Sequence, residues 1–175
     1  MKTSLLKYYG TFEVDGTVAC LSNLSELHKW QGAATDEGDY WPLVDLEYKD
    51  PFVNICPFQS QLGGSFYIVL SARYRFLMYG DGDQLAIMEV YSIEENATYP
   101  TELELEFIQE TSVIFENKET SVIVFDPLLD GNEVLDHPVN HQLINLPTGN
   151  YKVSYVKYDD EFIHLTGVYF VREGV

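Results

Sequence analysis

Basic residues are scarce in this chain of 175 residues. Ten Lys and Arg stand against 28 Asp and Glu, which gives a formal net charge of −18 at pH 7. Proteins that bind nucleic acid use Lys and Arg to displace the counterions of phosphate groups, so the composition argues against nucleic acid and against anionic membrane surfaces. A negative field attracts basic proteins and speeds their association. A basic protein is therefore the predicted kind of partner.

Long apolar runs and a cysteine framework are also missing. No run approaches the ~18 apolar residues of a membrane span, and residues 1–10 hold no apolar core of a secretion signal. We therefore expect a cytoplasmic protein. Cys20 and Cys56 are the only cysteines. Because a chain of this size buries enough apolar surface to fold without a bridge, we expect two buried free thiols.

Motifs for catalysis or cofactor binding are absent from the sequence. Gly63-Gly64 lacks the lysine of a phosphate-binding loop, and no serine lies in a Gly-x-Ser-x-Gly turn. His137 and His141 have a spacing that suits two metal ligands, but Pro138 interrupts it and no Cys or third His lies nearby. We expect no enzyme, no catalytic residues, no metal and no cofactor.

Aromatic residues are abundant, with 13 Tyr and 10 Phe, and they favour pleated sheets. Short β-favourable runs recur with turn signals about every ten residues, which predicts a β-sandwich or open barrel of about nine to ten strands. A single domain, residues 1–175, is expected. One short N-terminal helix is predicted over 22–30, where Ser22 or Asn23 can cap the first turn.

The part of the chain after this helix gives weaker signals. Residues 41–48 are β-favourable and predict a short strand that Asp50-Pro51 breaks. Residues 50–65 contain two prolines and two glycines, so we expect them to be mostly irregular.

The most regular pattern is residues 101–107, Thr-Glu-Leu-Glu-Leu-Glu-Phe. In a single strand its apolar side chains share one face and its carboxylates the other, about 6–7 Å apart. We call these acids the glutamate ladder: Glu102, Glu104 and Glu106. No basic residue adjoins them in sequence, so they need water or a cationic partner. The pattern predicts either an ordinary solvated sheet face or an acidic binding surface.

The acidic residues are concentrated around this ladder. Residues 80–136 contain 15 acids and one base, Lys118, and so carry 14 of the 18 excess negative charges. Candidate contacts for a basic partner are the ladder, six further acids, and two tyrosines as aromatic anchors. They are Glu102, Glu104, Glu106, Asp81, Asp83, Glu94, Glu95, Asp130, Glu133, Tyr91 and Tyr99.

The C-terminal quarter has a recurrent pattern. Residues 144–155, Ile-Asn-Leu-Pro-Thr-Gly-Asn-Tyr-Lys-Val-Ser-Tyr, give an apolar strand end, Leu-Pro-x-Gly-x-Tyr and an alternating strand, and an acidic turn and a last strand follow to Val171. This pattern resembles the closing strands of small acidic bacterial proteins such as the competence-nuclease inhibitor, and of immunity proteins encoded beside polymorphic toxins. The resemblance implies a non-catalytic inhibitor that covers the active cleft of a toxin, often a nuclease.

The leading hypothesis is therefore an immunity protein or inhibitor that blocks a basic toxin or nuclease through its acidic half. The alternative is a β-sandwich module that binds a small ligand, a carbohydrate or nucleotide, on a platform of aromatic rings such as Trp30 and Trp41. An exposed Trp41 in a cleft would favour this alternative, and a buried Trp41 would disfavour it. A subunit of a larger assembly, a homodimer included, also stays open.

Overall fold

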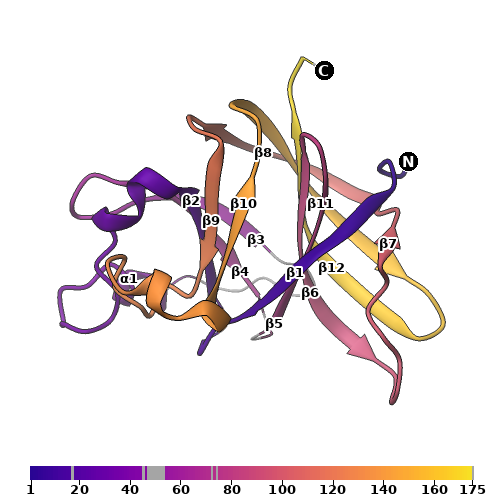
Figure 1. The fold of residues 1–175 in the computed structure, drawn as a ribbon, viewed down its shortest axis with the longest axis horizontal. Coiled ribbons are helices and arrows are strands. Elements are labelled where there is room, and N and C mark those ends of the chain that lie inside the picture. The colour runs from indigo at the N-terminus through magenta and orange to yellow at the C-terminus, as the bar shows by residue number, and fades with distance from the viewer. Residues whose placement is uncertain (17, 45, 47–53, 72, 74, 175) are drawn as a thin grey trace.

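The computed structural model describes residues 1–16, 18–44, 46, 54–71, 73 and 75–174. These residues form twelve strands in two antiparallel sheets (Figure 1), so the predicted mainly β class is confirmed. The first sheet has the strand order β7 (Glu102–Leu103), β1 (Leu6–Glu13), β5 (Arg75–Asp81), β6 (Gln84–Ile93), β12 (Ile163–Arg172), β11 (Gly149–Asp159) and β8 (Glu106–Asn117). The second has the order β10 (His141–Asn145), β9 (Ser121–Phe125), β2 (Val18–Asn23), β4 (Ser65–Leu70) and β3 (Asn54–Gln59).

The main core lies between the two sheets. Successive side chains of a strand point to opposite faces, and in β9 Val122 and Val124 face the seven-stranded sheet while Ile123 and Phe125 face outward. The outward side chains are also buried, because helical segments and loops cover that face (Figure 1). Trp30 is the centre of this cover, and its indole N–H donates to the Pro127 carbonyl at 2.9 Å.

The seven-stranded sheet curls until its two edges meet. Only two residues separate β7, at one edge, from β8, at the other. The N-terminal segment closes the gap, because the Thr3 N–H donates to the Leu105 carbonyl at 2.8 Å and the Phe107 N–H donates to the Met1 carbonyl at 3.1 Å. A second core of buried apolar side chains fills the inside of this curl.

The prediction that residues 101–107 form one strand is wrong. β7 ends at Leu103 and pairs with β1, whereas β8 begins at Glu106 and pairs with β11. The chain crosses between the sheet edges at Glu104 and Leu105, where the Leu105 N–H donates to the Thr3 hydroxyl at 2.9 Å. The alternation of buried leucines and exposed glutamates nevertheless persists through the break.

The predicted helix near the N-terminus is a 3-10 helix, η1 (Leu24–Lys29), that follows β2 directly. Asn23 does not cap it with its side chain. Its amide instead donates to the Glu116 carbonyl at 3.1 Å and accepts from the Lys118 N–H at 2.9 Å. Long-range bonds to the loop after β8 thus replace the local cap. Two further 3-10 turns precede β10, η2 (Val134–Asp136) and η3 (Pro138–Asn140).

Two predictions for residues 41–65 need correction. Residues 41–44 form a helical turn, α1 (Trp41–Val44), and not the start of a strand; Pro42 suits a first helical turn because that position needs no N–H bond. The rest of the predicted strand, apart from residue 46, lies outside the described residues. Part of the expected irregular segment is the strand β3, which accommodates Pro57 at a sheet edge.

Candidate functional site

The predicted acidic contacts do not form one surface. Asp81 and Asp83 flank the tight β5–β6 turn, in which Gly82 has a φ of +59°. Glu94 and Glu95 follow the other end of β6. Since β6 has ten residues, the two pairs lie about 30 Å apart at roughly 3.3 Å per residue. They cannot contact the same small patch of a partner.

Asp130 and Glu133 lie on a third surface, outside the five-stranded sheet. Their loop is attached to the end of η1, because the Gly131 N–H donates to the Trp30 carbonyl at 2.9 Å. The Asp130 carboxylate accepts from the Asn132 N–H at 2.9 Å and so orders its own turn. These two acids are therefore separate from the acids around β6.

The glutamate ladder faces lysines on neighbouring strands. Lys7 of β1 lies directly opposite Glu102, and Lys157 of β11 lies opposite Glu106 with its Nζ 3.6 Å from Oε2. Lys2 of the N-terminal segment also lies opposite Glu106, on the side away from β11. Residues directly opposite in a sheet share a face and interact. Lysines from distant parts of the sequence thus lie opposite two of the three glutamates, Glu102 and Glu106, which favours a solvated sheet face.

The two predicted aromatic anchors have different environments. The Tyr99 hydroxyl accepts from Nη1 of Arg75 at 3.2 Å, and the same guanidinium is paired with Glu13. These bonds raise the pKa of Arg75, that to Tyr99 first. Tyr99 is therefore half-buried and structural. Tyr91 is 50% exposed, and the guanidinium carbon of Arg73 lies 5.7 Å from its ring centroid, so only Tyr91 offers a free ring surface.

A compact acidic surface with apolar side chains lies where β6 ends and β11 turns into β12. The loop after β6 is joined to this turn by the Glu94 N–H, which donates to the Phe162 carbonyl at 2.8 Å. Phe162 is 49% exposed and Ile93 41%. A shallow pocket of about 370 Å³ lies between the two segments. We call this the acidic turn surface; it comprises Ile93, Glu94, Glu95, Glu161 and Phe162.

Asp160 holds the acidic turn surface in shape. Its Oδ1 accepts from the Phe162 and Ile163 N–H groups at 2.8 and 2.9 Å, and the Tyr158 hydroxyl donates to Oδ2 at 2.8 Å. The bond from the Phe162 N–H is the main reason that the pKa of Asp160 is lowered. Because the turn is already ordered, a partner would lose little conformational entropy in fixing Phe162.

Of the predicted contacts, only Glu94 and Glu95 belong to this surface. Sequence reasoning missed Glu161, which it assigned to the acidic turn, and Phe162, which it assigned to the start of the last strand. A signal was present in Asp-Asp-Glu-Phe, residues 159–162, because a large apolar residue inside an acidic turn has no local partner. That Glu94 would lie beside Phe162 could not be predicted without the pairing of β6 with β12.

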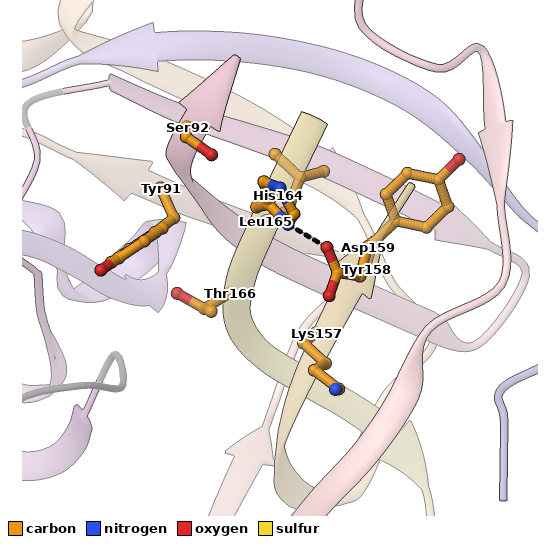
Figure 2. Close-up of a pocket in the computed structure, with 8 residues that line it drawn as sticks. All are labelled: Tyr91, Ser92, Lys157, Tyr158, Asp159, His164, Leu165 and Thr166. Atoms are coloured by element: carbon orange, nitrogen blue, oxygen red, sulfur yellow. Dashed lines mark ion pairs between the residues drawn. The ribbon is translucent and has the colours of Figure 1, made fainter. Parts of the chain in front are cut away.

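A second pocket, of about 320 Å³, lies on the other face of the same strand ends (Figure 2). Its side chains come from three adjacent strands. Asp159 of β11 pairs in register with His164 of β12, which pairs with Ser92 of β6, and His164 Nδ1 forms an ion pair with Asp159. Two residues further along the strands, Lys157 of β11 pairs with Thr166 of β12. Tyr91 is the extra residue of a β-bulge in β6, between Ser92, which pairs with His164, and Val90, which pairs with Leu165. We call this the Tyr91 pocket.

The remaining candidates for chemistry have structural roles. His141 Nδ1 lies 3.0 Å from the His137 carbonyl, across the short turn η3, and within the described residues no three His, Cys, Asp or Glu side chains are placed to hold a metal. Cys20 and Cys56 are free thiols, but only Cys20 is buried and Cys56 is half-buried. Burial raises the pKa of both, which makes them poor nucleophiles near neutral pH.

The tryptophans do not form the predicted platform together. Trp30 is fully buried and contacts Phe66 at 4.9 Å between ring centroids. Trp41 is 43% exposed, donates from its indole N–H to the Thr35 carbonyl at 2.7 Å, and packs against Tyr40. Tyr91, in contrast, is an exposed aromatic ring that does line a pocket.

Comparison of the chain with models of known protein families, with curated proteins and with solved structures gave no match. The resemblance of residues 144–171 to nuclease inhibitors and immunity proteins therefore stays a prediction. Among the described residues, no helix is long and apolar enough to cross a membrane.

Proposed function

We propose that this protein is a non-catalytic inhibitor of the immunity-protein kind, and that it binds a basic toxin or nuclease through the acidic turn surface. The observation that carries the proposal is Phe162, an exposed ring on an ordered turn that lines a pocket together with Glu94 and Glu95 and follows Glu161 in the chain. The glutamate ladder contributes only to the overall field, because lysines stand opposite it.

The charges of the acidic turn surface are available to a partner. No ion pair of Glu94, Glu95 or Glu161 occurs in the described part of the chain, and all three residues are exposed. The net charge of −18 adds long-range attraction for a basic protein. Charge complementarity mainly raises the association rate and the specificity.

The apolar part of the surface supplies affinity. Most of the binding energy of an interface comes from a few central side chains, often aromatic, with polar side chains around them. Phe162 and Ile93 are the exposed apolar side chains of the acidic turn surface and would supply this part. A nuclease is a suitable partner, because its substrate cleft is positive enough to hold phosphates, and carboxylates on a rigid turn can occupy the same positions.

Two charge-matched variants test the proposal. Glu94/Glu95/Glu161→Gln and Glu102/Glu104/Glu106→Gln each remove three negative charges, so both change the overall field equally. Binding and inhibition would be measured against a panel of purified basic DNases and RNases, with lysozyme and cytochrome c as basic controls. We expect at least one nuclease to bind, with about tenfold or greater weakening in the turn variant and less than threefold in the ladder variant.

The outcomes separate the parts of the proposal. Equal weakening by both triple variants would show that only net charge matters and would remove the acidic turn surface from it. Binding of the nucleases no tighter than of lysozyme or cytochrome c would overturn the inhibitor function itself.

A further inference from the structure

We propose that the Tyr91 pocket binds a neutral saccharide, a monosaccharide or disaccharide. This site is distinct from the acidic turn surface, because adjacent residues of a strand point to opposite faces. His164 lines the Tyr91 pocket, whereas Ile163 lines the pocket beside Phe162. The inference therefore does not rest on the proposed inhibitor function.

The pocket has the size and shape for a small ligand. Its volume of about 320 Å³ is at the lower end of the range of small-molecule sites, about 300–1,000 Å³. It lies on adjacent strands of a sheet, and β11 and β12 pair there without a register shift from Tyr151 to Asp159. Figure 2 shows the side chains of Tyr91, Ser92 and Thr166 on one side and those of Lys157 and Asp159 on the other.

The charges of the pocket favour a neutral ligand. Lys157 is paired with Glu106 at 3.6 Å, and His164 is paired with Asp159. An anion such as a nucleotide would have to compete with these carboxylates and with the negative field of the whole chain. A cation would meet the charges of Lys157 and of the Arg73 guanidinium, which lies over Tyr91.

The remaining groups suit a molecule that has an apolar face and hydroxyls at its edge. One face of the Tyr91 ring contacts Arg73, and we assign the other to the C–H face of a sugar ring. Thr166 donates its hydroxyl proton to Glu89 at 3.0 Å, which leaves its oxygen as an acceptor. The Ser92 hydroxyl and the second Asp159 oxygen can also bond sugar hydroxyls, which both donate and accept.

The test uses NMR titration of the ¹⁵N-labelled full chain. The probes are methyl glycosides of glucose, galactose, mannose and N-acetylglucosamine, the disaccharides maltose, cellobiose and lactose, and AMP as the anionic probe. We expect at least one neutral sugar to bind with a Kd of about 1 mM, as suits a small ligand in an open site. The shifted amides should be those of β6, β11 and β12 around the pocket.

Three variants locate the binding. Tyr91→Ala should weaken it about tenfold, and Tyr91→Phe should retain it because only the ring is required. Phe162→Ala is the matched control, since its ring is as exposed as that of Tyr91 but lies on the opposite face; it should leave sugar binding unchanged. Because the side chains of Tyr91 and Phe162 are both half-exposed, all three variants should fold, and their NMR spectra without sugar verify this.

Three results would overturn the inference. They are no shift with any neutral sugar at millimolar concentration, sugar binding that Tyr91→Ala leaves intact, and tighter binding of AMP than of every sugar. None of these results bears on nuclease inhibition, for which Phe162 is the sensitive residue.

Discussion

The glutamate ladder and the acidic turn surface are equally acidic in sequence but differ in what lies opposite their carboxylates. In the ladder, Glu102 and Glu106 face lysines of neighbouring strands, and the apolar residues between the acids are buried. In the acidic turn surface Glu94, Glu95 and Glu161 make no ion pair within the described residues, and the apolar Phe162 is exposed. The two surfaces therefore differ in the neighbours of their carboxylates and not in the number of their acids.

The largest effect is expected on stability, from Leu105, which lies between Glu104 and Glu106 of the ladder. Leu105 is fully buried where the sheet closes, so Leu105→Ala should lower the free energy of unfolding by about 2–5 kcal/mol through lost burial and a cavity. Glu104→Gln, one residue away and exposed, should change it by less than about 0.5 kcal/mol. Urea unfolding measures both, and equal effects would show that Leu105 does not seal the curl.

The next effect concerns binding by the acidic turn surface. Phe162→Ala should weaken binding of an inhibited nuclease about 30-fold, or about 2 kcal/mol, as for a central aromatic contact. Because Phe162 is half-exposed, stability should hardly change. The control is Leu62→Ala, which removes an equally exposed apolar side chain from the five-stranded sheet's β3–β4 turn. Calorimetric titration compares them, and similar losses would contradict a specific role for Phe162.

A smaller effect is expected at the residue that shapes the turn. Asp160→Ala removes the acceptor of two backbone N–H groups and should cost about 1 kcal/mol of stability. Asp160→Asn keeps an oxygen for these bonds but cannot ionise, so it isolates the contribution of the charge.

The contribution of the Asp160 charge depends on pH in a defined direction. Since the folded pKa is lowered, mainly by the bond from the Phe162 N–H, the ionised carboxylate stabilises the fold. This stabilisation is complete above the unfolded value of about 3.9 and is lost as the pH falls through the folded pKa. The difference in unfolding free energy between the native chain and Asp160→Asn should therefore narrow below about pH 4. A difference that widens in acid would contradict this assignment.

The smallest effect is expected for the ladder's ion pair. Lys157 and Glu106 are both partly exposed and their charged atoms are 3.6 Å apart, so a double-mutant cycle with Lys157→Met and Glu106→Gln should give a coupling of about 0.2–1 kcal/mol. The coupling should decrease in high salt. A coupling of zero would mean that the lysines opposite the ladder only reduce its field.

Much of the fold could be predicted where the pattern was local. The pattern over 144–155 predicted an alternating strand, then an acidic turn and a last strand to Val171, and the structure has β11 from Gly149 to Asp159 and β12 ending at Arg172. The predicted cap of the helix over 22–30, and the predicted start of a strand at 41–44, were wrong for tertiary reasons. Asn23 bonds to Glu116 and Lys118 at the end of β8 and not to its own helix. Leu43 is buried, as a strand would bury it, but it lies in the helical turn α1.

Less of the candidate site could be predicted, because its parts are far apart in sequence. Tyr91, Glu94 and Glu95 were identified as surface candidates by residue type alone. Their separation from Asp81 by the length of β6, and the contact of Glu94 with Phe162, depend on strand pairing.

The sequence by itself determined the charge of this protein, its β-rich class and the burial of alternate residues, because these follow from composition and from the two-residue period of a strand. Only the tertiary structure decided that Lys7 and Lys157 stand opposite the ladder and that Phe162 lies beside Glu94. The reason is that register is set when apolar faces pack together, and packing brings side chains from distant segments into one row.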